Sequence, residues 1–335
     1  MTANEPNAAN VLYTPTSYTE SFGDNLLIKD SDDITDPIPM LSINRTLIAS
    51  AGNISVIGGK QKSRKSFFIC MLSAAYLKGE YGMITANISE KRPILLFDTE
   101  MGKTHVQKAL RRICQMCGQN GQDDRLKVFF LRECTAVDTI EVLKAQMAQH
   151  NPGLVIIDGI VDMCNNFNDI GESTSLVQLL MSLSSLYNCH ITTVLHENKG
   201  VTDSNLRGHL GTILAQKSET VFQLQRDGDN TKVLPAATRN ISFQDFFFKI
   251  NEDGLPVILG VAQTPLKQTA TDKMVEAMRL TLDDKALCYG DLQREYMEVA
   301  GVKERTAQTH ISDCRKMNII FKSERDEKYR CTQYR

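Results

Sequence analysis

The stretch from Asn53 to Ser66, N-I-S-V-I-G-G-K-Q-K-S-R-K-S, decides the fold of this chain. Its first five residues predict an apolar β-strand, and residues 65–77 predict a helix. A strand, the pattern G-x-x-x-x-G-K-[ST] and a helix, in that order, form a phosphate-binding loop. The stretch matches the pattern at Gly59, Lys65 and Ser66 and departs from it at Arg64, where the pattern has a second glycine.

The chemistry of such a loop explains the residue types. Backbone N–H groups and the helix N-terminus face the phosphates, a lysine reaches the terminal phosphates, and a hydroxyl holds Mg²⁺. Four of the seven residues from 60 to 66 are basic, which favours an anionic ligand over a basic turn that binds nothing. We therefore expect ATP and Mg²⁺, with these nucleotide-binding residues: Gly59, Lys60, Gln61, Lys62, Ser63, Arg64, Lys65 and Ser66.

Arg64 leaves two alternatives for the loop. If the backbone requires a positive φ at this position, a residue other than glycine is strained there. If it does not, the loop keeps its shape and the arginine side chain points to solvent or to a neighbour.

Polar residues follow three further predicted strands. Residues 95–97 lead into Asp98-Thr-Glu100, residues 154–157 lead into Asp158, and residues 191–195 lead into His196. A carboxylate at such a strand end can activate a water or hold Mg²⁺. We expect Glu100 to be the base, Asp158 to share the metal with Ser66, and His196 to sense the γ-phosphate. The alternatives are strand-capping acids and a surface histidine.

Strands and helices alternate from about residue 50 to 210, which predicts an α/β fold with a parallel sheet flanked by helices on both faces. Later segments at 219–225, 232–236 and 243–250 predict an antiparallel extension. The expected organisation is a flexible tail (1–35), an ATPase domain (36–262), a linker (263–271) and a small C-terminal domain (272–335).

Bulk composition restricts the class of protein. The chain has 335 residues, 42% of them hydrophobic and 23% charged, with a net charge of −2, so any nucleic-acid binding must use local basic patches. The first ten residues do not resemble a signal peptide, and no run approaches the roughly 18 apolar residues of a membrane span. We expect a cytoplasmic protein with no membrane partner. The nine cysteines are then expected to be reduced thiols. The pair Cys114-x-x-Cys117 is expected to lie on a buried helix face, and a metal site is the less favoured alternative.

Residues 272–335 resemble a winged helix-turn-helix domain. Three helices are predicted at 272–282, 290–300 and 304–317, followed by two strands at 319–323 and 329–332. The third helix would be the recognition helix, and the strands a wing. A protein-interaction domain of the same shape is the alternative. The expected DNA-binding residues are Arg305, Gln308, Thr309, Arg315, Lys316 and Lys322.

Residues 35–260 resemble the RecA-like hexameric ATPases, in particular the plasmid RepA-type replicative helicases. The likeness is carried by G-K-Q-K-S-R-K-S, L-F-D-T-E-M, L-V-I-I-D-G, V-L-H-E-N-K and R-G-H-L-G. The resemblance implies that Glu100 activates water, that Asp158 is the Walker-B acid and that His196 is the sensor. It also implies a homo-oligomer, expected to be a hexameric ring. Arg239 would be the finger that enters the neighbouring subunit's site, and Arg207 is the second candidate.

This likeness has two departures, Arg64 for glycine and Glu197 where a second histidine is common. It implies a helicase or translocase acting on DNA in replication or mobilisation of a mobile element, with other replication or mobilisation proteins as partners. A nucleotide-switched DNA-binding or loading protein is the alternative. A regulator that barely hydrolyses ATP is a third reading, and Glu100 counts against it.

Overall fold

The computed structural model describes residues 27–118, 122–198, 205–261, 270–282, 285–317, 319–323 and 325–331. The chain divides into two compact units, Met1–Ala262 and Gln263–Arg335, which we describe separately. Most of the predicted tail (1–26) and most of the predicted linker (262–269) lie outside the described residues. Residues 27–38 are exposed and form no helix or strand.

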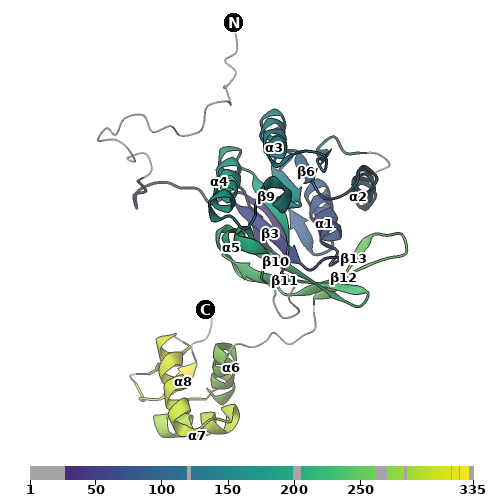
Figure 1. Cartoon of the computed structure of the whole chain (residues 1–335). Coiled ribbons are helices and arrows are strands. Elements are labelled where there is room, and N and C mark those ends of the chain that lie inside the picture. Colours follow the sequence, from purple (N-terminus) through teal and green to yellow (C-terminus); the bar gives the residue numbers. More distant parts are fainter. Residues whose placement is uncertain are drawn as a thin grey trace. The chain divides into compact units, whose positions relative to one another are not determined.

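A sheet of nine strands forms the centre of the first unit (Figure 1), in the order β13-β12-β11-β10-β3-β9-β8-β6-β7. Six strands are parallel: β3 (Ile54–Gly59), β6 (Ile94–Asp98), β7 (Leu126–Phe130), β8 (Leu154–Asp158), β9 (His190–His196) and β10 (Thr220–Asp227). The remaining strands extend the sheet in antiparallel pairs: β11 (Asn230–Thr238), β12 (Phe246–Ile250) and β13 (Pro256–Val261).

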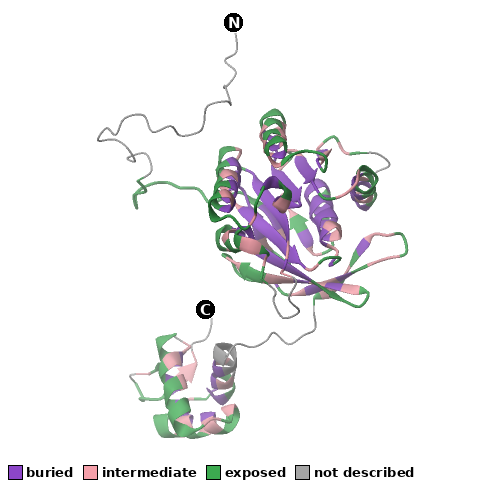
Figure 2. Ribbon diagram, viewed as in Figure 1, coloured by how far each residue is buried: buried purple, intermediate pink, exposed green. Residues whose placement is uncertain are grey.

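Helices cover both faces of the parallel strands, because successive strand side chains point to opposite faces. Ile57, Leu96 and Ile156 belong to one buried cluster, and Val56 and Phe97 to the other. The first cluster includes residues of α1 (Lys65–Lys78) and α2 (Lys103–Met116). The second includes residues of α3 (Ala136–His150), the short helix η2 (Ile160–Met163), α4 (Ile170–Leu186) and α5 (Gly208–Lys217). Figure 2 shows the buried strands between these exposed helix faces.

This architecture confirms the predicted fold class, a RecA-like P-loop core with a parallel sheet, helices on both faces and an antiparallel extension. One prediction about the extension was wrong. The segment at 219–225 belongs to β10, which pairs in parallel with β3, so the extension begins at β11. The next strand starts at Phe246 instead of residue 243. Helix α5 and strand β13 were not predicted.

A second, four-stranded sheet was also missed. Its order is β2-β1-β5-β4, and its strands are β1 (Pro39–Ile43), β2 (Thr46–Ser50), β4 (Glu80–Tyr81) and β5 (Ile84–Ala86). Strands β4 and β5 follow α1 directly, and both contact that helix. The sheet buries Met40, Leu41 and Ile43 in the same cluster as α1, so it extends the core on that face.

The second unit contains α6 (Ala270–Leu282), α7 (Tyr289–Ala300) and α8 (Glu304–Lys316), followed by an antiparallel pair, β14 (Ile320–Lys322) and β15 (Tyr329–Cys331). A small core formed around Tyr296, Ile311 and Cys314 holds these elements together. The three helices and two strands lie where the sequence predicts them. Their assignment as a DNA-binding winged helix remains a prediction.

Two bulk expectations can be compared with the structure. Across the described part of the chain, no helix is long and apolar enough to cross a membrane. Cys114 is buried and Cys117 is partly buried, and neither is in a disulfide. The described residues contain no group of His, Cys, Asp or Glu side chains that could hold a metal ion by itself.

Candidate nucleotide site

The phosphate loop joins β3 to α1 at the carboxyl end of the parallel strands. Gly59 is required there by close packing, since a Cβ at this position would lie 2.5 Å from the Ser63 Oγ and 2.7 Å from the Leu224 carbonyl oxygen. The Ser63 hydroxyl is buried and has no hydrogen-bond partner among the described residues. A buried hydroxyl without a partner inside the loop fits a site in which a bound polar ligand supplies the hydrogen bond.

Lys65 lies at the centre of the loop. Its ammonium group donates to the carbonyl oxygens of Gly59 (2.9 Å) and Lys60 (3.0 Å), and its Nζ lies 3.0 Å from the Nδ1 of His196. The side chain is buried, and burial lowers the pKa of the lysine against the opposing charges of Asp158, Glu100 and Glu197. The loop thus holds one buried cation directed at the place where phosphates would bind.

Arg64 has a positive φ, so it adopts the backbone conformation in which a residue other than glycine is strained. Its φ of 67° and ψ of 30° are those of a left-handed residue, the conformation for which glycine is suited. The side chain points to a neighbour: the guanidinium donates to the carbonyl oxygen of Asp229 (2.5 Å) and lies 3.5 Å from the Thr231 hydroxyl, in the β10–β11 hairpin. Arg64 therefore keeps the backbone shape that glycine normally provides, while its charge is directed to the hairpin.

The other loop residues differ in exposure. Gln61 and Lys62 are exposed, and Lys62 has a positive φ of 62°. Lys60 donates to the carbonyl oxygen of Asn198 and lies 3.9 Å from the carboxylate of Glu197. Glu197 is buried and also accepts a hydrogen bond from Gln223 (2.9 Å). Glu197, which stands where a second histidine is common, thus contacts both the phosphate loop and β10.

Ser66 and Asp158 meet at the start of α1. The Ser66 hydroxyl donates to the Oδ2 of Asp158 at 3.0 Å. Burial raises the pKa of Asp158 to about 7, and the nearby carboxylates of Asp98 and Glu100 contribute to that rise. A hydroxyl and a carboxylate oxygen at one point are the hard ligands that Mg²⁺ prefers, and a bound cation would offset the crowding of negative charge. These two residues fit the metal that the loop implies.

Glu100 and His196 complete the site. The Nε2 of His196 lies 3.4 Å from the Oε1 of Glu100, while its Nδ1 faces Lys65. The hydrogen bond from His196 is the main reason that the pKa of Glu100 is lowered. One imidazole ring therefore bridges the loop lysine and the carboxylate, and the three residues that the sequence singled out separately lie in direct contact.

Asp98 has a different part in this arrangement. It is buried, and its Oδ1 accepts hydrogen bonds from the backbone N–H groups of Glu100 (3.1 Å) and Met101 (2.8 Å). Asp98 thus caps the end of β6 and fixes the backbone of Glu100. Sequence analysis missed Asp162, which accepts a hydrogen bond from Thr99 (2.8 Å) and lies beside the site. Its place in η2, four residues after the Walker-B position, was the available signal.

The two candidate finger arginines lie in different places. Arg239 follows Thr238, which pairs with Thr220, and Thr220 pairs with Ser55 near the start of β3. Arg239 is therefore at the opposite end of the sheet from its own phosphate loop, and its exposed guanidinium donates to the Lys217 carbonyl oxygen (3.0 Å). Its guanidinium is therefore remote from the phosphate loop of the same chain.

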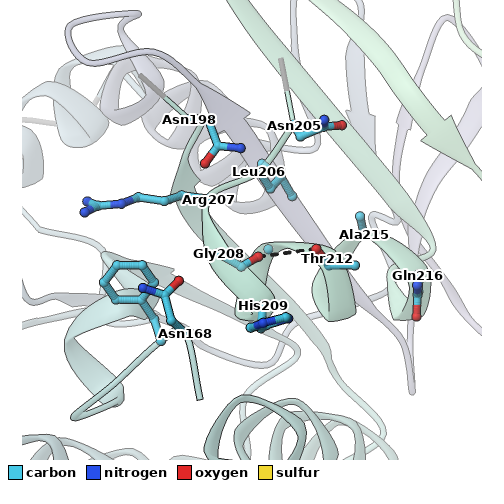
Figure 3. Close-up of a pocket in the computed structure, with 12 residues that line it drawn as sticks. Asn168, Asn198, Asn205, Leu206, Arg207, Gly208, His209, Thr212, Ala215 and Gln216 are labelled. Atoms are coloured by element: carbon cyan, nitrogen blue, oxygen red, sulfur yellow. Dashed lines mark hydrogen bonds between the residues drawn. The ribbon is translucent and has the colours of Figure 1, made fainter. Parts of the chain in front are cut away.

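Arg207 lies beside its own site. Its backbone N–H donates to the His196 carbonyl oxygen (3.0 Å), and its guanidinium stacks on Phe167 at 4.6 Å. The side chain lines a cavity of about 690 Å³ together with Glu100 and His196. A second cavity of about 710 Å³ adjoins it at the start of α5 (Figure 3). Amide, imidazole and hydroxyl groups line this second cavity, from Asn168, Asn198, Asn205, His209, Thr212 and Gln216.

The predicted DNA-binding residues belong to the second unit. Arg305, Gln308 and Thr309 are exposed on the face of α8 opposite to the buried Ala307 and Ile311. Arg315 is also exposed. Lys316 and Lys322 are exposed but form ion pairs with Asp313 (3.1 Å) and Glu327 (3.6 Å). Nucleic-acid phosphates would have to displace these carboxylates.

Comparison with known proteins gives one family match and similar solved structures. The family described as an AAA domain matches residues 24–201, more than half of the chain. No curated protein sequence matches. Among solved structures, the RadB recombinase is similar at 15% identity and a TM-score of 0.43, over 61% of this chain and 90% of that chain. A second solved structure, described as an ATPase domain, is similar at 15% identity and a TM-score of 0.45, over 62% of this chain and 85% of that chain. From its matched family and its phosphate loop, the chain belongs to the AAA domain family.

Proposed function

We propose that this chain is a Mg²⁺-dependent ATPase that assembles into a homo-oligomeric ring and acts on DNA. One observation carries the proposal: Lys65, His196 and Glu100 form a continuous chain of contacts of 3.0 and 3.4 Å, beside the pair formed by Ser66 and Asp158. A cation for the terminal phosphates, a metal site and a general base are what ATP hydrolysis requires.

Each group of residues in the site has a separate role in the proposed hydrolysis. The loop backbone and Lys65 bind the phosphates, and the lysine exchanges its carbonyl partners for phosphate oxygens. Ser66 and Asp158 would hold Mg²⁺, which supplies positive charge to the phosphate oxygens. The hydrogen bond from His196 lowers the pKa of Glu100 despite its partial burial, so the carboxylate stays ionised and can orient the attacking water and accept its proton. His196 contacts both Lys65 and Glu100 and so couples phosphate binding to the position of the base.

In the assembled ring, a neighbouring copy would supply an arginine that stabilises the charge on the terminal phosphate during hydrolysis. Arginine fingers of this kind increase the rate of phosphoryl transfer roughly 10³–10⁵-fold. Because Arg239 lies at the far end of the sheet from its own loop, we assign it to the site of the next copy in the ring. Arg207 lines the cavity beside Glu100 in the same chain, which supports a role in substrate or nucleic-acid contact within one subunit.

DNA is the proposed partner of both units. The polar cleft at the start of α5 offers amide and hydroxyl groups together with Arg207 and Phe167, a combination suited to phosphates and bases of a single strand. The exposed face of α8 offers Arg305, Gln308 and Arg315 to a duplex. Replication or mobilisation of a mobile element is the process that the family resemblance favours, with helicase or translocase activity.

Two assays on the full chain test the proposal. ATP hydrolysis is measured with Mg²⁺ or EDTA, and with or without single-stranded DNA, while strand displacement is followed on a tailed duplex. We expect hydrolysis that needs Mg²⁺ and that DNA accelerates. Hydrolysis and DNA binding without strand displacement would favour the alternative, a nucleotide-switched loading protein. Absence of hydrolysis under all conditions would refute the proposed function.

A further inference from the structure

Glu219 is a buried carboxylate at the start of β10, at the end of the sheet opposite to the nucleotide site. It is 5% exposed. Its Oε2 accepts a hydrogen bond from the backbone N–H of Ser50 (2.8 Å), and its Oε1 accepts from the Ser50 hydroxyl (2.9 Å) and from the Asn240 amide (2.8 Å). Three donors from two distant segments thus converge on one acid.

These donors supply the hydrogen bonds that a buried carboxylate needs. A buried carboxylate is costly unless it is hydrogen-bonded or paired. His190 lies 3.8 Å away, but its Nδ1 faces the Ser50 carbonyl oxygen at 2.8 Å and its Nε2 faces the Ser55 hydroxyl at 2.9 Å. Burial lowers the pKa of this histidine, so it is neutral and adds no positive charge. Glu219 therefore depends on Ser50 and Asn240.

The same residue is attached to Arg239 by two routes. The backbone N–H of Arg239 donates to the carbonyl oxygen of Glu219 at 2.8 Å, and the Asn240 side chain donates to its carboxylate. The Arg239 guanidinium donates to the Lys217 carbonyl oxygen, two residues earlier. An exposed turn is thus held by hydrogen bonds to a buried glutamate.

We propose that Glu219, acting through Asn240, is a positioning residue for catalysis in the neighbouring copy of this chain. It holds the Arg239 turn in the orientation from which the guanidinium enters the next site and meets the terminal phosphate. The inference rests on the proposed function, in which Arg239 acts across a subunit interface. It adds a residue that touches neither nucleotide nor metal but whose loss slows hydrolysis in trans.

Asn240→Ala is the sharpest test, since Asn240 is exposed and the buried acid keeps both bonds from Ser50. Asn240→Ala removes one of the two links between Glu219 and the Arg239 turn. We expect kcat for ATP to fall about tenfold or more, with KM unchanged and a small decrease in the melting temperature. Amide hydrogen exchange at Arg239 should become faster. The matched control is Asn251→Ala, which removes an asparagine that bonds within the β12–β13 turn; its kcat should equal that of the unaltered chain.

Mixing experiments separate a role in trans from a role within one subunit. Asn240→Ala mixed with Glu100→Gln should recover part of the activity, because some interfaces pair an intact Glu100 with a well-placed Arg239. Lys65→Ala mixed with Glu100→Gln should recover none, because no single site then both binds ATP and carries the base. Combining Asn240→Ala with Arg239→Ala should cost no more than Arg239→Ala alone. Glu219→Gln should resemble Asn240→Ala in kcat, with a lower melting temperature.

The possible failures are distinguishable. If Arg239→Ala is slow while Asn240→Ala turns over normally, the positioning role is wrong and the proposed function stands. A further loss in the double variant, or an effect of Asn240→Ala confined to KM or melting temperature, would also overturn the inference. If Arg239→Ala is fully active, both the finger and this inference are wrong. Absence of hydrolysis by the unaltered chain refutes the proposed function and this inference together.

Discussion

Replacement of Arg64 by glycine tests how the loop works without its usual residue. Three contributions to the free energy of unfolding can be compared. A left-handed residue other than glycine costs roughly 1–2 kcal/mol, which glycine would recover. Loss of the exposed hydrogen bond to Asp229 costs about 0.5–1.5 kcal/mol, and the added freedom of glycine in the unfolded chain costs about 0.4–1 kcal/mol. These ranges sum to between about −1.5 and +1 kcal/mol, so the expected net change in stability is small.

Arg64→Ala is the matched control, because it loses the same hydrogen bond but keeps the left-handed strain. We expect it to be less stable than Arg64→Gly by roughly 1 kcal/mol. In a unit of this size that difference corresponds to a melting temperature lower by about 2–4 °C, measurable by calorimetry.

Nucleotide binding by Arg64→Gly should change little. The guanidinium is bonded to the hairpin, and Lys65 already supplies the cation at the phosphates. A titration with a slowly hydrolysed ATP analogue should give a Kd within about threefold of that of the unaltered chain, or roughly 0.7 kcal/mol. ATPase activity should be retained or increased. A loss of affinity as large as that of Lys65→Ala would refute this reasoning and make Arg64 a primary phosphate ligand. If Arg64→Ala were more stable than Arg64→Gly, the claim that the backbone is strained at this position would be wrong.

Lys65→Ala should abolish tight ATP binding, because it removes the buried cation at the centre of the loop; micromolar affinity in a nucleotide titration would contradict the loop assignment. Asp158→Asn should weaken the Mg²⁺ dependence of turnover, and an unchanged Mg²⁺ titration would mean that Asp158 is structural. Glu100→Gln should bind ATP almost normally and hydrolyse it about 10²–10⁴-fold more slowly, whereas normal turnover would transfer the role of base to another carboxylate. Arg239→Ala should bind ATP and assemble but hydrolyse poorly, and activity of the unaltered chain should rise with protein concentration; concentration-independent activity with a fully active variant would instead favour a site within one subunit.

The local patterns of the sequence were sufficient for the core of the fold. The strand–loop–helix signal at 53–66 and the alternation of apolar strands with helices depend on neighbouring residues, so they can be read without knowing the tertiary contacts. The same holds for the polar strand ends at Glu100, Asp158 and His196. Parallel strands bring their carboxyl ends to one edge of the sheet, and this rule predicts that such residues lie close together.

Pairing partners were harder to predict. The segment at 219–225 looked like the antiparallel strands after it, but β10 pairs in parallel with β3, and a strand's own residues do not state which neighbour it will have. The two-residue strand β4 and the three-residue strand β5 are too short to carry a periodic signal. Helix α5 includes two glycines, at 208 and 211, and glycine lowers helix propensity, so the local pattern indicates a helix only weakly.

The sequence by itself determined that the chain has a phosphate loop and which residue types stand at each strand end. The tertiary structure alone decided how these side chains are used. Arg64 is directed to a carbonyl oxygen 165 residues away, and Glu219 is stabilised by Ser50, 169 residues away. A hydrogen bond depends on distances and angles between atoms, and for residues so far apart in the chain only the folded sheet brings those atoms together.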